Sequence, residues 1–202
     1  MPDMLVKLYD LPPLTPALVV AARHGGMIRR ALRDDQSSAV AWVRRPCSRW
    51  RVRPSLARHG ARDARFVGIT GTNGKSTTTT LVGRMLEAAG RHTLVGGNIG
   101  TPVSSQVEAS TPDTVHVIEV SSFQLETTRT FHPWIAVWLN ITDDHLDRHA
   151  SLDEYFAAKA RIFRNQGQGD WAVVNADDPK VMAAAAGTRA TTVTFGLDQA
   201  LS

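Results

Sequence analysis

Short runs of hydrophobic residues alternate with polar segments from residue 66 to the end of the chain. Six of these runs have the length of a buried strand, and they cover residues 66–70, 93–95, 115–120, 135–140, 172–175 and 191–195. Short apolar runs bounded by glycine and polar residues are typical of strands that are covered on both faces. The pattern therefore predicts a mostly parallel sheet.

Three segments between or after these strands carry the signals of helices. Residues 75–89 have apolar residues at helical spacing and stop at Gly90, which suits the left-handed conformation that often follows a helix. The sequence SLDE has the form of a capping box and predicts a helix over residues 151–164, and a third helix is expected over residues 179–187. Strands that alternate with helices predict an α/β fold with helices on both faces of the sheet. Ligands of such folds bind at the carboxyl ends of the strands.

A glycine-rich loop follows the first predicted strand and leads directly into the first predicted helix. Its sequence is GTNGKST. Glycines let backbone amides turn toward an anion, the helix N-terminus adds partial positive charge, and a lysine can reach phosphate oxygens. The loop is therefore predicted to bind the phosphates of a nucleotide through Gly71, Thr72, Asn73, Gly74, Lys75, Ser76 and Thr77.

Two residues of this loop indicate which nucleotide complex it takes. In a P-loop the lysine reaches the terminal phosphates and the hydroxyl that follows it coordinates Mg²⁺. Lys75 and Ser76 occupy these positions, so a nucleotide phosphate together with Mg²⁺ is the expected ligand. The strict pattern has glycine where this chain has Ile69, so the loop is a variant. The alternative, a glycine-rich turn with a solvated lysine, is disfavoured by the order of strand, loop and helix.

Charge is divided unevenly along the chain. Residues 1–65 hold 13 Lys and Arg against 5 Asp and Glu, whereas residues 66–202 hold 10 against 14. The basic part shows no sustained hydrophobic periodicity and no nucleic-acid-binding module. We interpret it as an irregular, Arg-rich segment and expect no nucleic-acid partner. No run approaches the roughly 18 apolar residues of a membrane span, and the single cysteine, Cys47, fits a reducing cytoplasm.

Three further motifs follow the loop in order along the chain. They read GGNIG at residues 96–100, EVSSFQLE at 119–126 and NITDDHLDRH at 140–149. Together with GITGTNGKST at 68–77, they resemble the Mur ligases, and among these the enzymes that add D-glutamate. The resemblance covers residues 66–202 and implies most of the family's central ATP-binding domain. Residues 1–65 are then expected to be a remnant of the N-terminal domain, and the C-terminal domain is expected to be absent.

The resemblance also implies roles for residues that follow the strands. It implies that Glu119 binds Mg²⁺ beside the γ-phosphate together with Ser76. It implies that Asn98, Ser121 and Gln124 hold the substrate from loops at the same edge of the sheet. Without the resemblance, the glutamate would be interpreted as a solvated residue at a strand end. The other three would be interpreted as turn residues or caps.

A second metal site is implied at His145 and Lys159, with the lysine carbamoylated. Lys159 lies among alanines on a predicted helix, where desolvation favours the neutral amine to which CO₂ adds. Without the resemblance, Lys159 would be a surface lysine and His145 a loop histidine. With Lys75 and Glu119, these two residues complete the implied catalytic set.

The implied reaction is ATP-dependent amide formation in the synthesis of a peptidoglycan precursor. The γ-phosphate of ATP passes to the carboxylate of UDP-N-acetylmuramoyl-L-alanine, and the amine of D-glutamate then displaces phosphate from the acyl phosphate. Positioning and charge neutralisation supply most of the catalysis. A cytoplasmic monomer is expected. A chain without the family's flanking domains is expected to bind nucleotide but not to make the amide bond by itself.

Two other functions stay open from the sequence. The first is an ATP-dependent ligase similar to folylpolyglutamate synthetase, against which the motifs at 96–100 and 119–126 count. The second is a nucleotide-binding remnant without ligase activity. Phosphate release that depends on the muramoyl substrate or on folate separates the two ligases, and ATP binding without either release identifies the remnant.

Overall fold

One parallel sheet forms the centre of the computed structural model, which describes residues 63–142 and 151–197. Its strands are β1 (Arg65–Thr70), β2 (Thr93–Gly97), β3 (Val115–Glu119), β4 (Ile135–Trp138), β5 (Trp171–Asn175) and β6 (Thr191–Phe195). All five pairings are parallel, and the strand order is β2-β3-β1-β4-β5-β6. The predicted parallel sheet is confirmed, and each strand ends within two residues of its predicted bounds.

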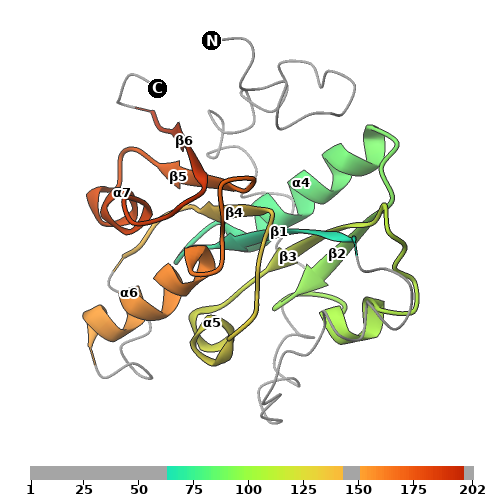
Figure 1. The fold of residues 1–202 in the computed structure, drawn as a ribbon, viewed down its shortest axis with the longest axis horizontal. Coiled ribbons are helices and arrows are strands. Elements are labelled where there is room, and N and C mark those ends of the chain that lie inside the picture. Colours follow the sequence, from blue (N-terminus) through green and yellow to red (C-terminus); the bar gives the residue numbers. More distant parts are fainter. Residues whose placement is uncertain (1–62, 143–150, 198–202) are drawn as a thin grey trace.

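Helices lie on both faces of this sheet, as predicted. They are α4 (Lys75–Ala88), α5 (Ser122–Thr127), α6 (Leu152–Ala160) and α7 (Pro179–Ala185), with 3₁₀ turns η3 (Val103–Gln106) and η4 (Arg161–Phe163). Figure 1 shows α4 on one side of the sheet and α5 and α6 on the other. The helix predicted to run to residue 164 changes to a 3₁₀ turn after Ala160. No helix in the described part of the chain is long and apolar enough to span a membrane.

Two helix ends follow the local sequence signals. Gly90 adopts a φ of 75°, and the Arg91 amide donates to Leu86 O at 3.0 Å, which closes the C-terminus of α4. At the start of α6, Ser151 Oγ accepts a hydrogen bond from the Glu154 amide at 3.2 Å. Each bond satisfies a backbone group that the helix itself leaves unpaired, so these elements begin and end where the sequence predicts.

Alternate residues of the central strands belong to two different hydrophobic cores, because successive side chains of a strand point to opposite faces. The core beneath α5, α6 and α7 includes Phe66, Ile118, Leu125, Trp138, Tyr155 and Val181. The core beneath α4 includes Val67, Ile69, Val117 and Val137, with Val82 and Leu86 of the helix packed against it. The sheet is therefore covered on both faces, which explains why its strands carry so few charged residues.

The register of the strands brings four strand ends to one edge of the sheet. Glu119 at the end of β3 lies beside Ile69 of β1 and Gly97 of β2. Thr70 at the end of β1 lies beside Trp138 at the end of β4. The residues that follow β1, β2, β3 and β4 therefore meet at the carboxyl edge, where ligands of such sheets bind.

Candidate nucleotide-binding site

The loop between β1 and α4 has the backbone geometry of a phosphate site. Gly74 is the N-cap residue of α4 and adopts a φ of 80°, in the left-handed region that favours glycine. It has no side chain to bond the first amides of the helix, and both Gly74 and Ser76 are exposed. The amides and the positive end of the helix dipole are thus available to an anion.

The ammonium group of Lys75 is held within this loop. Its Nζ donates to the carbonyl oxygen of Thr72 at 2.7 Å, and the side chain is half-buried. A phosphate oxygen would be a stronger acceptor than this neutral carbonyl, because its negative charge also attracts the ammonium group. The lysine is therefore positioned to exchange the loop carbonyl for a phosphate.

Glu119 lies directly beside the start of α4 and is only 2% exposed. Ser76 Oγ donates to its Oε2 at 2.7 Å, and Asn98 Nδ2 donates to its Oε1 at 2.9 Å. The Asn98 amide also donates to the backbone oxygen of Glu119, again at 2.9 Å. Within residues 63–142 and 151–197, no lysine, arginine or histidine forms an ion pair with this carboxylate.

The side-chain oxygen atoms of Ser76 and Glu119 could coordinate Mg²⁺. Mg²⁺ prefers oxygen ligands and is usually bound by one or two carboxylates together with substrate phosphates. A buried carboxylate without a cation is costly, and a divalent ion beside it would compensate its charge. The described residues contain no group of three or more His, Cys, Asp and Glu side chains suited to a metal, so phosphate or water would complete the coordination.

Lys159 is buried next to the same loop, with 1% of its surface exposed. Its Nζ donates to the carbonyl oxygen of Gly71 at 2.8 Å and to Thr70 Oγ1 at 3.4 Å. The nitrogen also lies 4.8 Å from the centre of the Tyr155 ring. The alternative of a surface lysine is therefore wrong, and α6 brings a buried amine to the start of the phosphate loop.

Ser121 and Gln124 lie after β3, but they do not share a loop. Ser121 is the N-cap of α5, and Gln124 lies in the first turn of that helix, so its expected place on a loop is wrong. Ser121 Oγ accepts from the Gln124 amide at 3.3 Å, and Gln124 Oε1 accepts from the Ser121 amide at 2.9 Å. These reciprocal bonds form a capping box, which starts a helix too short to show periodicity. The interpretation of Ser121 as a cap is confirmed, and a role in substrate binding stays a prediction for both.

Two residues that the sequence left without a role also contact the loop. Asn140 Oδ1 accepts from the amides of Thr72 and Asn73, and Tyr155 Oη lies 3.1 Å from Thr72 Oγ1. Asn140 lies two residues after β4 and is the last residue of the predicted strand 135–140, so its place near the ligand-binding ends of the strands was a usable signal. His145 lies outside the described residues, and its expected role stays a prediction.

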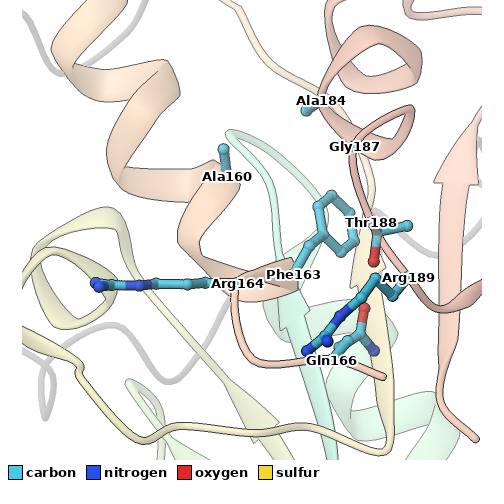
Figure 2. Close-up of a pocket in the computed structure, with 8 residues that line it drawn as sticks. All are labelled: Ala160, Phe163, Arg164, Gln166, Ala184, Gly187, Thr188 and Arg189. Atoms are coloured by element: carbon cyan, nitrogen blue, oxygen red, sulfur yellow. The ribbon is translucent and has the colours of Figure 1, made fainter. Parts of the chain in front are cut away.

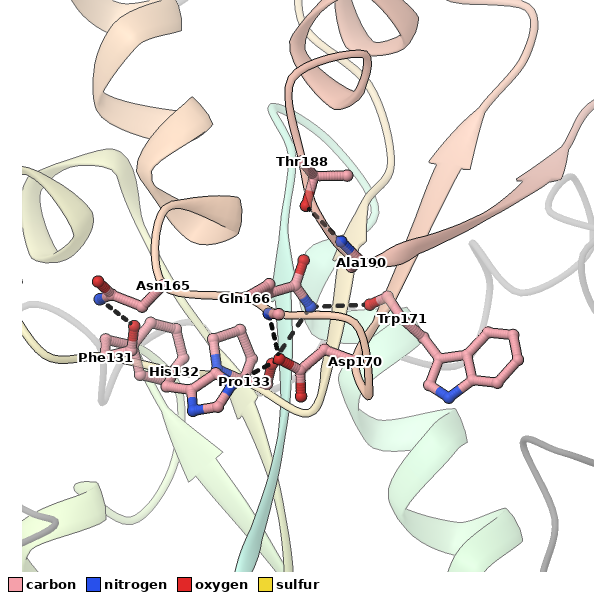
Figure 3. A network of polar contacts seen from close by, with 10 residues as sticks. Phe131, His132, Pro133, Asn165, Gln166, Asp170, Trp171, Thr188 and Ala190 are labelled. Atoms are coloured by element: carbon pink, nitrogen blue, oxygen red, sulfur yellow. Dashed lines mark hydrogen bonds and ion pairs between the residues drawn. The ribbon is translucent and has the colours of Figure 1, made fainter.

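A pocket lies at the other end of the sheet, near the amino ends of β5 and β6. It measures about 210 Å³ and is lined by Ala160, Phe163, Arg164, Gln166, Ala184, Gly187, Thr188 and Arg189 (Figure 2). Beside it, Gln166 Nε2 donates to Pro133 O and Trp171 O, and His132 Nε2 lies 2.5 Å from Asp170 Oδ2 (Figure 3). These contacts join the segments that precede β4 and β5, so they stabilise the amino ends of the strands, away from the phosphate loop.

Comparison with known proteins identifies close relatives. Residues 69–201 match the family model described as "Mur ligase middle domain". The UDP-N-acetylmuramoylalanine–D-glutamate ligase of Pelotomaculum thermopropionicum is 57% identical over 64% of this chain and 29% of its own length. The ligase of the same name from Solibacter usitatus is 53% identical over 96% of this chain and 38% of its own length. The chain thus spans less than two fifths of either relative.

Solved structures agree with the fold. The MurF ligase of Thermotoga maritima, determined in complex with ADP, matches 73% of this chain and 35% of its own length with a TM-score of 0.59 and 22% identity. A UDP-N-acetylmuramoyl-L-alanyl-D-glutamate–2,6-diaminopimelate ligase matches 75% of this chain and 36% of its own, with a TM-score of 0.58 and 24% identity. At this identity the structures support the architecture alone. The family model spans about two thirds of the chain, and the chain accordingly belongs to the Mur ligases, with residues 69–201 matching their middle domain.

Proposed function

We propose that this chain forms the ATP-binding part of a ligase that joins D-glutamate to UDP-N-acetylmuramoyl-L-alanine. The names of relatives at 53–57% identity support this substrate pair. The observation that carries the proposal is the meeting of Lys75, Ser76 and Glu119 at the carboxyl ends of β1 and β3. Lys75 supplies a cation, Ser76 a hydroxyl group and Glu119 a buried carboxylate, which are three groups that a phosphoryl-transfer site uses.

Each of these groups has a task in phosphoryl transfer. Backbone amides of the loop and the Lys75 ammonium group hold the phosphates and balance their charge. Ser76 and Glu119 hold Mg²⁺, which, when bound, neutralises charge on the transferring phosphoryl group. Asn98 keeps the Glu119 carboxylate turned toward Ser76 through its 2.9 Å hydrogen bond.

The proposed reaction has two displacements. A carboxylate oxygen of UDP-N-acetylmuramoyl-L-alanine attacks the γ-phosphorus of ATP, and the bond to ADP breaks. The amine of D-glutamate then attacks the carbonyl carbon of the acyl phosphate, inorganic phosphate leaves with the bonding electron pair, and the amine loses a proton. The chain contributes positioning and charge, and none of its described side chains is assigned as a covalent nucleophile.

Lys159 belongs to the proposal as a second anionic ligand in its carbamate form, together with His145. Its burial supports this, because desolvation favours the uncharged amine that reacts with CO₂. Formation of the carbamate would replace the hydrogen bond to Gly71 O and supply two oxygens in place of a cation. Oxygens of this kind are the ligands that Mg²⁺ prefers.

A calorimetric titration with Mg·ATP tests the nucleotide part. Lys75→Ala is expected to weaken binding by about tenfold to a hundredfold, because a hydrogen bond to a charged group contributes about 1.5–3 kcal/mol. Arg164→Ala is the matched control, since this exposed cation follows η4 near the amino ends of the strands, away from the loop. Equal affinities of the wild type and Lys75→Ala would show that the loop does not bind phosphate.

A chimera tests the ligase part. Residues 63–202 would replace the matching segment of the Solibacter usitatus enzyme, which is 53% identical to this chain. Phosphate release that requires both the muramoyl substrate and D-glutamate is the expected result. Release that instead requires folate would identify the alternative ligase. Nucleotide binding without either release would identify a remnant.

A further inference from the structure

We propose that Asn140 is a positioning residue that holds the first half of the phosphate loop and thereby decides which loop amides remain for phosphate. The inference rests on the proposed function only in assuming that phosphate binds at this loop. Asn140 follows β4, and the loop follows β1. The two strands pair in parallel, so both segments emerge at the same edge of the sheet.

The carboxamide of Asn140 bonds to the loop backbone through both its oxygen and its nitrogen. Its Oδ1 accepts from the Thr72 amide at 3.0 Å and from the Asn73 amide at 2.9 Å. Its Nδ2 donates to the Asn73 carbonyl oxygen at 3.1 Å. A flipped amide would place its NH₂ group against two N–H donors, so only one orientation satisfies all three groups.

The backbone of Asn140 is fixed from its other side. Its carbonyl oxygen accepts from Trp138 Nε1 at 3.1 Å, and it also accepts from the Thr72 amide at 3.0 Å. Trp138 is fully buried in the core beneath α6. The asparagine is therefore a rigid template, because its backbone is tied to the core and its side chain is tied to the loop.

The loop consequently divides into a held half and an open half. The held half includes Thr72, whose Oγ1 accepts from the Thr142 amide at 3.0 Å and contacts Tyr155 Oη at 3.1 Å. Its amide and that of Asn73 are already used by Asn140. The open half begins at Gly74, where the left-handed turn starts α4. Phosphate must then be bound by the amides from residue 74 onward together with Lys75.

Asparagine is the side chain that this arrangement requires. Aspartate has acceptors for both loop amides, but in its ionised form it cannot donate to Asn73 O and would add negative charge beside the phosphates. A protonated aspartate could make all three bonds. The ordinary pKa of aspartate is about 3.9, so at neutral pH the carboxylate of Asn140→Asp is ionised, and the variant keeps both acceptors but lacks the donor.

The test combines two measurements on the whole chain: amide hydrogen exchange at Thr72 and Asn73 by NMR, and titration with Mg·ADP. Asn140→Ala is expected to speed exchange most at the Asn73 amide, because the Thr72 amide keeps the backbone oxygen of residue 140 as an acceptor, and to weaken Mg·ADP by about tenfold or more. Asn140→Asp is expected to keep exchange slow at both amides, because its carboxylate still accepts from them, while weakening Mg·ADP through its negative charge. Asn165→Ala is the matched control, because its Nδ2 also donates to backbone oxygens, including that of Phe131, at the opposite edge of the sheet (Figure 3).

Unchanged exchange at the Asn73 amide in Asn140→Ala would overturn the inference, whatever the nucleotide result. Equal loss of Mg·ADP affinity in Asn140→Ala and Asn165→Ala would also overturn it, because the effect would then be one of general stability. If Asn140→Ala does not fold, Asn140→Asp decides the question, and fast exchange at both amides in that variant would overturn the inference. A wild-type chain that binds no Mg·ADP would contradict the proposed function, and the exchange measurement would still decide whether Asn140 holds the loop.

Discussion

At the scale of single residues, the burial and the hydrogen-bond partners of the Glu119 carboxylate are the most informative feature of the site. It is removed from water, and its two oxygens accept hydrogen bonds only from the neutral donors Ser76 and Asn98 among the described residues. Burial of a charge costs several kcal/mol, and neutral donors offset only part of this cost. A cation bound beside this carboxylate would compensate a charge that the described residues meet only with neutral donors.

The Glu119→Gln variant separates the cost of burying this charge from its contribution to metal binding. Without divalent cations, the free energy of unfolding is expected to stay the same or rise by about 1 kcal/mol, because an uncharged isostere removes the desolvation cost. The new amide can donate to Ser76 Oγ and accept from Asn98. Binding of Mg·ATP should weaken more than binding of metal-free ATP, as measured by titration with and without Mg²⁺.

Glu126→Gln is the control for this experiment, since Glu126 is exposed on α5 and is expected to change neither quantity. A clear fall in the free energy of unfolding of Glu119→Gln without divalent cations would contradict the prediction. It would mean that the two neutral donors already compensate the buried charge.

At the scale of elements, the close approach of β2 to β3 places Asn98 over Glu119. Gly97 ends β2 opposite Glu119 and adopts a φ of 105°. A Cβ atom at this position would collide with the backbone oxygen of Glu119. Because of this close approach, the backbone amide of Asn98 lies 2.9 Å from the same oxygen. The glycine therefore fixes the position of Asn98 relative to the Glu119 carboxylate.

Gly97→Ala is expected to destabilise the fold by about 2–3 kcal/mol, because it combines an unfavourable φ with a backbone collision. Gly90→Ala is the control, since Gly90 also has a positive φ of 75° but open space around it. The control should cost about 1 kcal/mol from the φ alone. Chemical denaturation measures both variants, and equal losses would show that β2 can move away from β3 at little cost.

At the scale of the whole molecule, a buried histidine ties η3 to the sheet. His116 lies stacked on Phe66, with ring centres 4.8 Å apart. Its Nδ1 lies 2.9 Å from Gln106 Oε1, and its Nε2 lies 2.8 Å from Ser110 Oγ. Gln106 Nε2 donates to two backbone oxygens, so its Oε1 is an acceptor and Nδ1 of the neutral ring carries the proton. Burial lowers the pKa of His116 from 6.5 to about 4, with a smaller contribution from His92.

This lowered pKa predicts a loss of stability in acid. The unfolded chain binds a proton at His116 near pH 6.5, whereas the folded chain does so only near pH 4. Above pH 6.5 the two states bind equally, and the free energy of unfolding falls as the pH drops from 6.5 to 4. At pH 5 the loss is about 2 kcal/mol.

Urea denaturation of the wild type and His116→Gln at pH 7.5 and pH 5 measures this loss. The wild type should lose about 2 kcal/mol more than the variant between the two pH values. Carboxylates that titrate in the same range contribute to both proteins and cancel in the comparison. The same pH dependence in both proteins would show that folding does not lower the pKa of His116.

Local signals in the amino-acid sequence determine most of the elements. Runs of apolar residues mark all six strands, and Gly90 and Ser151 mark helix ends, because these features depend on neighbouring residues alone. The phosphate loop is also evident, since strand, glycines, lysine and helix follow one another in the chain. The short helix α5 escapes prediction, because six residues show no periodicity and only the capping pair of Ser121 and Gln124 marks it.

Only the tertiary structure decided which side chains meet around the loop. Asn140 bonds to Asn73, which lies 67 residues earlier, and Lys159 contacts Gly71, which lies 88 residues earlier. These contacts depend on the order in which parallel strands pair, and hydrophobic periodicity carries no information about that order. The sequence alone therefore predicts the phosphate loop and the strands around it. Burial of Lys159, compensation of Glu119 by neutral donors and support of the loop by Asn140 arise because β3 and β4 pair on either side of β1.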